Sequence, residues 1–297
     1  MIIVAGGSGL LGQHVVTDLL ARGEKVRVLV RDVARARALF GDAIEVVAGD
    51  VRRAEGLDEL VAGASVVVSA VHGFLGGRGA GPVEVDDRGN ANLVDAAAAA
   101  GAGVVLVSVL GASPDSPVDL FRAKHAAEQH LRGSGTPWTI VRASAYLETW
   151  LTVLTKTAGT SGRPLIFGRG EQPIQFVSAL DVAAVVSRAA TDSTLRGQIF
   201  EIAGEPITMT ELARALHDAH GWHGSPRHLP RPLLRILSVL ARPISPAFAR
   251  QNQTALAMDT GLLTVDAPDE PRVLRISAAL SALLAQRIER LGLGPGD

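Results

Sequence analysis

A turn built from glycines at the start of the chain constrains this sequence more than any other feature. The apolar run Ile2–Ala5 leads directly into Gly6-Gly7-Ser8-Gly9-Leu10-Leu11-Gly12, and a helical pattern follows. Glycines 6, 9 and 12 give the spacing G-x-x-G-x-x-G. A strand, a tight glycine turn and a helix in this order are typical of α/β folds that bind the pyrophosphate of a dinucleotide at the helix N-terminus.

Each glycine of this turn has a separate task in that interpretation. One allows the sharp turn, one lets backbone N–H groups approach the phosphates, and one lets the helix pack closely on the sheet, because none of them carries a Cβ atom. The first residues of the helix add the positive end of its dipole. The expected cofactor-binding residues of the turn are Gly6, Ser8, Gly9, Leu10, Leu11 and Gly12. A glycine-rich turn without a ligand is the alternative interpretation.

Apolar runs rich in valine and isoleucine alternate with helical patterns through the first two-thirds of the chain. The runs are Ile2–Ala5, Val26–Val30, Ile44–Val47, Ser65–Ala70, Val104–Val109 and Trp138–Val141. Continuous apolar runs are typical of strands buried on both faces of a parallel sheet, which helices connect by right-handed crossovers. The helices expected between them are Leu11–Arg22, Arg88–Ala100 and Ala123–Leu131. We therefore predict a Rossmann-type α/β fold with a doubly wound parallel sheet.

The last third of the sequence has a different pattern. Thr208-Met209-Thr210-Glu211 is a capping box that begins a helix, and five prolines follow between positions 226 and 246. Ser277 precedes a further amphipathic pattern over Ala278–Arg290. We expect a core over residues 1–155, to which residues 174–203 return, and a smaller, mostly helical lobe over residues 204–297.

The ends of the predicted strands supply further candidates, because ligands bind at the carboxyl ends of parallel strands. Arg31 follows the second strand, where a guanidinium suits the 2′-phosphate of NADP(H) and a carboxylate suits the ribose of NAD(H). We therefore expect NADP(H) in preference to NAD(H). A solvated Arg31 paired with Asp32 is the alternative.

The third and fourth strands end in a second group of candidates. Asp50 is expected to accept a hydrogen bond from an adenine amino group with Val51 against the ring, or else to cap the next helix. His72 is either a proton carrier or a solvated loop residue. The backbone expected to line the ribose is that of Ser69, Ala70 and Val71.

Composition excludes several classes of protein. Of the 297 residues 47% are hydrophobic, and 29 basic against 30 acidic residues leave a net charge of −1, which argues against a disordered chain and against a nucleic-acid binder held by charge. The absence of cysteine excludes disulfides, thiolate metal sites and cysteine nucleophiles, and a reducing cytoplasm is the expected location. Leu233–Arg242 is too short for a transmembrane helix. Its apolar part, Leu233–Leu240, is expected in the core of the lobe or in a lid, and a surface-lying amphipathic helix is the alternative.

These residues together resemble the short-chain dehydrogenase/reductase superfamily, and most closely its atypical NmrA-like and isoflavone-reductase-like branch of NAD(P)H-binding proteins. The glycine turn, Val30-Arg31-Asp32, Asp87–Leu93, Val107–Ala112 and Phe176–Ala183 carry the resemblance over most of the chain. Thr139-Ile140-Val141-Arg142-Ala143 resembles a strand that usually ends in Arg-Pro, with Ala143 in place of the proline.

The resemblance implies a catalytic Tyr-x-x-x-Lys pair, and here the sequence departs from it. Lys124 matches the lysine that holds the nicotinamide ribose, with Glu128 four residues later, but Leu120 stands where the proton-donating tyrosine belongs. Ser108 matches the family's catalytic serine. The single tyrosine, Tyr146, lies beyond the sixth strand and is either a substitute donor or an aromatic residue at the rim of the site.

Two functions of different kinds remain open. The first is an NADPH-dependent reductase that passes hydride to an electron-poor small molecule such as a quinone, an enone or a dye, without the usual tyrosine. The second is a non-enzymatic NADP(H)-binding sensor or scaffold. A sugar-nucleotide epimerase is disfavoured because that chemistry needs the missing tyrosine.

Four histidines lie close together in sequence at the start of the lobe: His217, His220, His223 and His228. We expect a solvated cluster there in preference to a zinc site.

Overall fold

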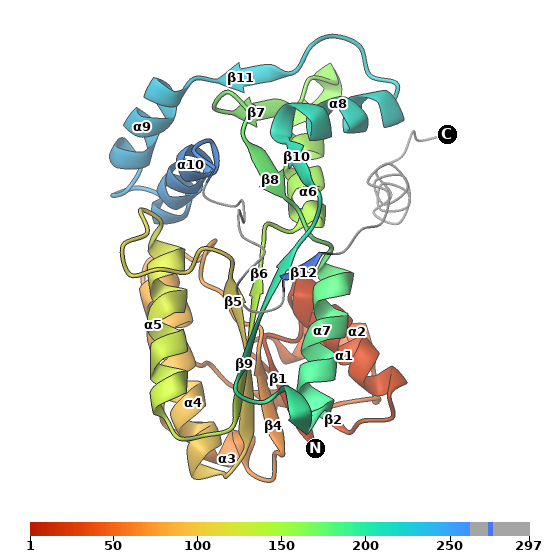
Figure 1. The fold of residues 1–297 in the computed structure, drawn as a ribbon, viewed down its shortest axis with the longest axis vertical. Coiled ribbons are helices and arrows are strands. Elements are labelled where there is room, and N and C mark those ends of the chain that lie inside the picture. Colours follow the sequence, from red (N-terminus) through yellow and green to blue (C-terminus); the bar gives the residue numbers. More distant parts are fainter. Residues whose placement is uncertain (262–272, 276–297) are drawn as a thin grey trace. The chain divides into compact units, whose positions relative to one another are not determined.

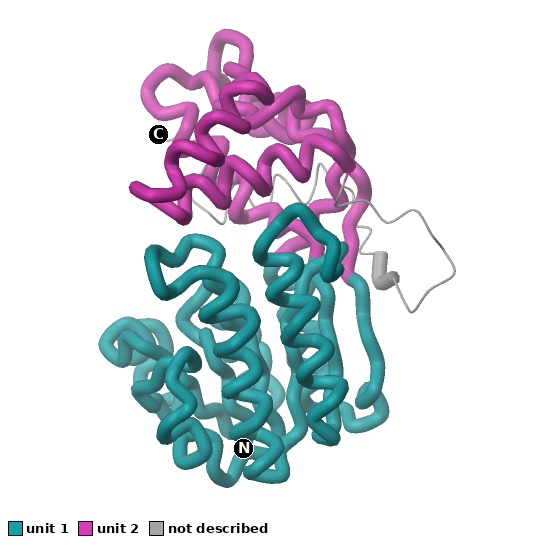
Figure 2. Tube along the Cα trace, turned by 90° about the vertical axis from the view of Figure 1, so that its left-hand side faces the viewer, with its two compact units in different colours: residues 1–143, 179–201 teal, residues 144–178, 202–297 magenta. Residues whose placement is uncertain are grey.

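The computed structural model describes residues 1–261 and 273–275, and it divides the chain into two compact units. The first unit contains Met1–Ala143 and Ala179–Glu201, and the second contains Ser144–Ser178 and Ile202–Asp297 (Figure 2). The division therefore falls near residue 143 where we expected 155. The helix expected over Ala278–Arg290 lies outside the described residues.

The first unit is built on a parallel sheet whose strand order confirms the predicted fold class. The order is β12-β9-β6-β5-β4-β1-β2-β3, and the pairs from β6 to β3 are all parallel. The strands are β1 (Ile2–Ala5), β2 (Val26–Val30), β3 (Glu45–Ala48), β4 (Val66–Ser69), β5 (Gly103–Val109), β6 (Trp138–Ala143), β9 (Gln198–Ala203) and β12 (Val273–Arg275). The last two residues of β9 and all of β12 fall in the sequence range of the second unit. The order 3-2-1-4-5-6 reverses direction between β1 and β4, which is where such sheets bind dinucleotides.

Helices cover both faces of this sheet (Figure 1). On one face lie α1 (Leu10–Ala21), α2 (Val33–Phe40) and α7 (Ala179–Thr191), and on the other lie α3 (Leu57–Val61), α4 (Asn90–Ala99) and α5 (Asp119–Gly133). The continuous valine and isoleucine runs follow from this arrangement, since the residues of β1 and β4 are buried on both sides. A short 3₁₀ turn, Ser193–Leu195, follows α7.

Two helices of the first unit begin earlier than the sequence predicted. A π-helical segment, Val83–Gly89, runs directly into α4, so the helix expected from Arg88 starts five residues sooner. The helix expected from Ala123 begins at Asp119. The π-helical segment contains Asp86, a fully buried residue that the helical pattern alone did not assign. Such π-helical turns frequently occur at functional sites.

The second unit is a mixed lobe with short strands. Its helices are α6 (Leu147–Ala158), α8 (Met209–Ala219), α9 (Arg231–Leu240) and α10 (Pro246–Met258), with a 3₁₀ turn at Gly159–Ser161. The capping box at Thr208 and Glu211 begins α8 as predicted. Two small sheets, which the sequence analysis missed, pair β7 (Leu165–Phe167) with β11 (Arg227–Leu229) and β8 (Pro173–Gln175) with β10 (Pro206–Thr208).

Candidate dinucleotide site

The glycine turn is as compact as its sequence predicted. Gly6 has φ +82°, and a Cβ atom there would lie 2.8 Å from the carbonyl oxygen of Ala70. A Cβ atom on Gly12 would lie 2.2 Å from the carbonyl oxygen of Gly6. Both glycines are therefore required by the protein's own packing. Gly9 differs, because a Cβ atom there would approach only the carbonyl oxygen of Gly6, at 3.3 Å.

The N-terminus of α1 has unused hydrogen-bonding capacity. Its N-cap residue is Gly9, which has no side chain to cap the helix, and its first turn contains no acidic residue. The side-chain amide of Gln13 donates a hydrogen bond to the carbonyl oxygen of Ser8, at 2.9 Å. The N–H groups at the start of a helix have no partner within the helix, so this end of α1 offers donors and partial positive charge to an anion.

The two residues after β2, Arg31 and Asp32, have different surroundings. Asp32 accepts a hydrogen bond from the backbone N–H of Arg35 at 2.9 Å and so caps α2. Arg31 is exposed and has no hydrogen bond or ion pair within residues 1–261. The alternative of an Arg31–Asp32 pair is not what the structure contains, so the guanidinium of Arg31 remains available to a ligand.

Asp50 and Val51 are engaged with the protein itself. Both carboxylate oxygens of Asp50 accept hydrogen bonds from the Arg52 side chain, at 3.0 Å from its Nε. These hydrogen bonds hold the pKa of Asp50 below its ordinary value, and the nearby charge of Arg31 lowers it further. Val51 is buried in the core of the first unit. Asp50 does not cap the next helix, since the N-cap of α3 is Gly56, and its expected contact with adenine stays a prediction.

A buried polar network stands behind the end of β4. The hydroxyl of Ser69 donates to the side-chain oxygen of Asn90, and the Asn90 amide donates to the backbone oxygen of Asp86 at 2.8 Å. The carboxylate of Asp86 is completely buried and accepts from the backbone N–H of Gly73 at 2.7 Å. Asp86 and Asn90 thus fix the loop that follows Ser69, Ala70 and Val71, whose backbone was expected to line the ribose. His72, in this loop, is exposed.

Lys124 is tied into the same network. Its ammonium group lies 3.1 Å from a carboxylate oxygen of Asp86 and donates to the carbonyl oxygen of Val71 at 3.0 Å. The Lys124 side chain is 6% exposed. A buried ammonium beside a buried carboxylate is far less costly than either charge alone. The lysine therefore holds the end of β4 in place.

Ser108, in β5, belongs to a second polar network. Its partner in α5 is Glu128, one helical turn after Lys124. Its hydroxyl donates to Glu128, which also accepts two hydrogen bonds from Arg142, at 3.0 and 2.6 Å. Arg142 also donates to Glu201 at 3.0 Å. Its hydrogen bonds with Glu128, and then those with Glu201, raise the pKa of Arg142 above its ordinary value. Ser108 therefore points its proton at a buried carboxylate of its own unit.

Tyr146 stands at the start of α6, in the second unit. Nearby, Ser178 donates to the buried carboxylate of Glu148 at 2.7 Å. Desolvation, and then the charge of Glu148, raise the pKa of the Tyr146 hydroxyl above its usual value. The hydroxyl is therefore protonated around neutral pH. Its role opposite Lys124 and Ser108, which lie in the first unit, stays a prediction.

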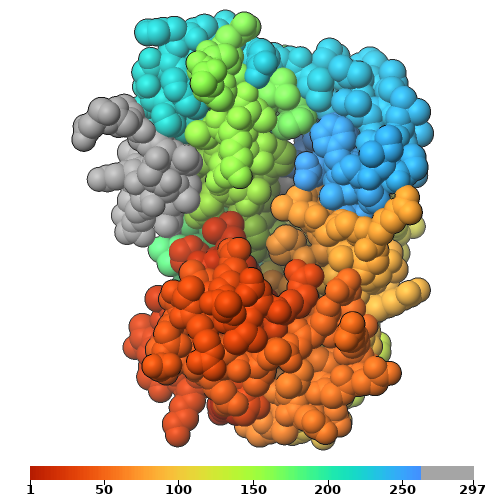
Figure 3. Space-filling view, turned by 180° about the vertical axis from the view of Figure 1, so that it is seen from behind, coloured from red at the N-terminus to blue at the C-terminus, as the bar shows by residue number. Residues whose placement is uncertain are grey.

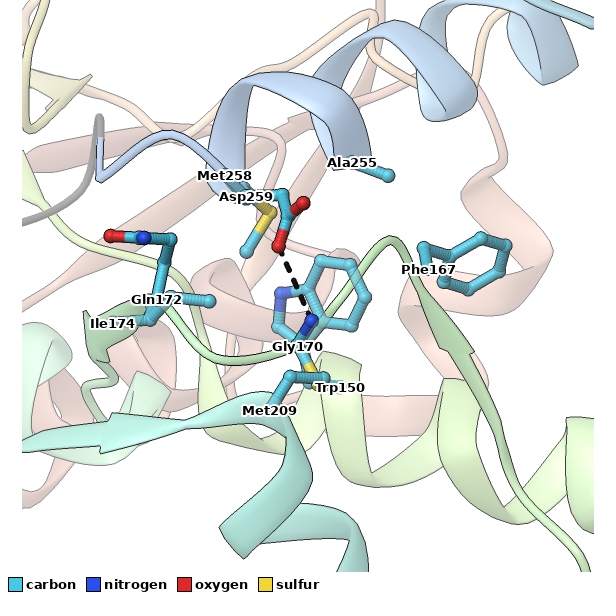
Figure 4. A pocket seen from close by; sticks show the side chains of 9 residues that line it. All are labelled: Trp150, Phe167, Gly170, Gln172, Ile174, Met209, Ala255, Met258 and Asp259. Carbon is cyan, nitrogen blue, oxygen red and sulfur yellow. Dashed lines mark hydrogen bonds between the residues drawn. The ribbon is translucent and has the colours of Figure 1, made fainter. Parts of the chain in front are cut away.

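The second unit also contains an apolar hollow of its own, with about 300 Å³ of space counting the part open to solvent (Figure 4). Its lining residues are Trp150, Phe167, Gly170, Gln172, Ile174, Met209, Ala255, Met258 and Asp259. Asp259 accepts from the backbone N–H of Gly170 at 3.2 Å and lies 3.1 Å from Nε of Arg231.

The histidines at the start of the lobe have separate surroundings. His220 stacks on Trp222 with 4.1 Å between ring centroids, and desolvation lowers its pKa. His217 lies 3.5 Å from Asp218, and the ring of His228 lies 3.2 Å from the carbonyl oxygen of Gly168. Among the described residues no three histidine, aspartate or glutamate side chains are grouped so that they could hold a metal ion.

Sequence reasoning missed Asp86 and Asn90, the partners of Lys124 and Ser69. Asn90 lies at the start of the predicted helix Arg88–Ala100, but Asp86 precedes that helix, so the sequence did not place the two side chains on one helix face. The partners of Glu128 were also missed. Arg142 was quoted only as part of a strand, and Glu201 lies 59 residues from it in sequence.

Comparison with known proteins agrees with the geometry. The family model described as NAD(P)H-binding matches residues 6–193. The chain is 32% identical to the NAD(P)H azoreductase of Xenophilus azovorans over 74% of either chain. It is 28% identical to quinone oxidoreductase 2 of Escherichia coli, over 74% of this chain and 75% of that one. The solved structure of a Citrobacter triphenylmethane reductase complexed with NADP(H) superposes with a TM-score of 0.75 at 21% identity, covering 97% of this chain and all of that chain.

Proposed function

The chain belongs to the NAD(P)H-binding family, and from that premise we propose that it is an NADPH-dependent reductase of electron-poor small molecules. The observation that carries the proposal is the glycine turn. Gly6 and Gly12 are required by internal packing, whereas a Cβ atom on Gly9, beside an uncapped helix N-terminus, would approach only the carbonyl oxygen of Gly6, at 3.3 Å. A pyrophosphate fits that combination, because it needs both the space and the donors.

The expected preference for NADPH over NADH rests on Arg31. The side chain is exposed, free of partners within residues 1–261, and close enough to Asp50 to lower that residue's pKa. Asp32, which would repel a 2′-phosphate, is held in the cap of α2. A free guanidinium at the end of β2 supports binding of the 2′-phosphate.

Bound NADPH would supply the hydride, and the residues of this chain would position it. The turn and the N-terminus of α1 would hold the pyrophosphate, and Arg31 the 2′-phosphate. Lys124 and Asp86 would keep the end of β4 rigid along the ribose. Positioning of this kind contributes a large part of the rate enhancement when no proton has to be moved by the protein.

Two observations support the proposed substrate class: the positions that the family uses for proton transfer hold no free donor, and the names of the relatives state what they reduce. Leu120 cannot transfer a proton, Ser108 donates to Glu128, and Lys124 is paired with Asp86. An acceptor that takes hydride and then a proton from water does not need such a donor. Quinones and dyes meet this condition, and the names of two relatives state azoreductase and quinone oxidoreductase activity. We therefore propose a quinone or dye-like acceptor.

A cofactor sensor without turnover is the second candidate. The observation that favours it is that Lys124 and Ser108 are each engaged with a buried carboxylate. Such a protein would bind NADP(H) through the same turn and respond to its redox state.

One experiment distinguishes the two functions. Loss of NADPH absorbance is followed with a panel of quinones, azo dyes, triphenylmethane dyes and enones, with Gly9→Val as the control that should not bind cofactor. We expect acceptor-dependent consumption by the wild type and none by the variant. Tight NADPH binding without consumption on any acceptor would contradict the reductase and favour the sensor.

A further inference from the structure

Within the described residues, one apolar face of helix α9 is exposed. Leu234 and Ser238 are buried on the side that packs against α10, while large apolar side chains project from the other side. Ile244, in the turn after α9, is 88% exposed, and Leu240 is 65% exposed. We call the exposed group the α9 patch; it consists of Leu233, Ile236, Val239, Leu240, Ile244 and Phe248. The patch belongs to the blue surface that α9 and α10 form in Figure 3.

The spacing of these residues makes the patch a continuous stripe. Leu233, Ile236 and Leu240 lie three and four positions apart, so they share one side of the helix. A folded protein rarely exposes so many large apolar side chains together unless that surface binds something.

The charged residues of the sequence segment that carries the patch have a single sign. From Ala219 to Met258 the sequence contains five arginines and no aspartate or glutamate, although the whole chain has a net charge of −1. Two of these arginines have other partners: Arg227 donates to the carbonyl oxygen of Thr157, and Arg231 pairs with Asp259. Arg235 and Arg242 are exposed and have no ion pair within residues 1–261.

We propose that the α9 patch docks the protein on the surface of an anionic membrane. An apolar stripe with flanking arginines matches the interface of such a bilayer, where side chains enter the acyl boundary and cations meet the headgroups. The ten residues of α9 are too few to cross a bilayer, and no helix in the described part of the chain is long and apolar enough to do so. The helix would therefore lie parallel to the surface.

A bilayer is favoured over a second copy of the chain by the same charges. Two copies that met through this patch around a two-fold axis would face each other with identical surfaces. Arg235 and Arg242 of each copy would approach those of the other, with no carboxylate nearby in the sequence to compensate. Anionic lipid supplies that compensation.

The test is co-sedimentation of the full chain with vesicles of phosphatidylcholine, with and without phosphatidylglycerol. We expect binding only when phosphatidylglycerol is present, and weaker binding at high salt. Replacing both arginines, Arg235→Gln with Arg242→Gln, should lower the partition coefficient roughly fivefold for each charge removed. Ile236→Ser with Leu240→Ser should lower it more than about tenfold.

A matched control separates the patch from general surface hydrophobicity. Leu39 in α2 is 42% exposed, so Leu39→Ser removes a comparable side chain from the first unit and should leave vesicle binding unchanged. Unchanged NADPH affinity in all variants would verify that they are folded. The proposal is overturned if the wild type does not sediment with anionic vesicles. It is also overturned if the wild type is a dimer in sedimentation-velocity ultracentrifugation and Ile236→Ser with Leu240→Ser makes it a monomer.

Discussion

At the scale of single residues, the glycines of the glycine turn are constrained in different ways. Packing within the protein leaves no room for a side chain at Gly12, since a Cβ atom would lie 2.2 Å from the carbonyl oxygen of Gly6. Gly9 has no such neighbour closer than 3.3 Å. The protein's own packing therefore constrains Gly9 less than Gly12, and the proposed pyrophosphate is a separate reason for glycine at this position.

Two substitutions separate these reasons. Gly12→Ala should destabilise the fold by about 1–3 kcal/mol, the usual cost of forcing an extra carbon into a packed site. Gly9→Val should leave the midpoint of urea unfolding near that of the wild type and abolish NADPH binding in titration calorimetry, because the side chain would occupy the place of the pyrophosphate. Unchanged NADPH affinity in a folded Gly9→Val variant would place the cofactor elsewhere.

Arg31 gives a prediction about cofactor choice. A charged hydrogen bond to the 2′-phosphate contributes about 1.5–3 kcal/mol, so Arg31→Ala should weaken NADPH binding by that amount and leave NADH binding nearly unchanged. Titration calorimetry with both cofactors measures the difference. Arg35→Ala, on the next helix turn, is the control, because Arg35 contributes only its backbone N–H to the cap of α2. Equal losses for NADPH and NADH would refute the role given to Arg31.

At the scale of elements, α5 connects two buried networks to the sheet. Lys124 faces Asp86 and the end of β4, and Glu128, one turn later, faces Ser108 and Arg142. Both residues were singled out through the family resemblance, which implies a lysine and a glutamate four residues apart, and residues at this spacing share a helix face.

Their partners could not be read from the sequence, for a physical reason. Asp86 lies in a π-helical segment, which breaks the regular period on which helix prediction depends. Arg142 meets Glu201 only because β6 and β9 are neighbours in the sheet, and strand order beyond consecutive pairs is not a local property of the chain. The short strands β7, β8, β10 and β11 were missed similarly, since three residues are too few to show alternation.

The Lys124–Asp86 pair gives a prediction about stability. Lys124→Met leaves a fully buried carboxylate without its cation, and breaking a buried pair in this way costs about 3–5 kcal/mol. Adding Asp86→Asn removes the uncompensated charge and should restore a substantial part of that loss, as measured by urea unfolding. If the two changes simply add their separate losses, the residues do not act as a pair.

At the scale of the whole molecule, the proposed reaction is one that needs no proton donor from the protein. The family's usual donor position holds Leu120, and the one tyrosine, Tyr146, belongs to the second unit, where burial and Glu148 raise its pKa. A reaction that takes its proton from water avoids the need for any of these groups.

The corresponding prediction compares two reactions in one protein. NADPH consumption with a quinone should proceed in the wild type and at a similar rate in Tyr146→Phe, because the phenol proton is not needed. Oxidation of simple secondary alcohols by NADP⁺ should be absent from both, since that reaction requires a base to remove the hydroxyl proton. Both rates are read from the absorbance of NADPH. Rapid alcohol oxidation by the wild type, lost in Tyr146→Phe, would identify Tyr146 as the acid/base and overturn the assignment of proton transfer to water.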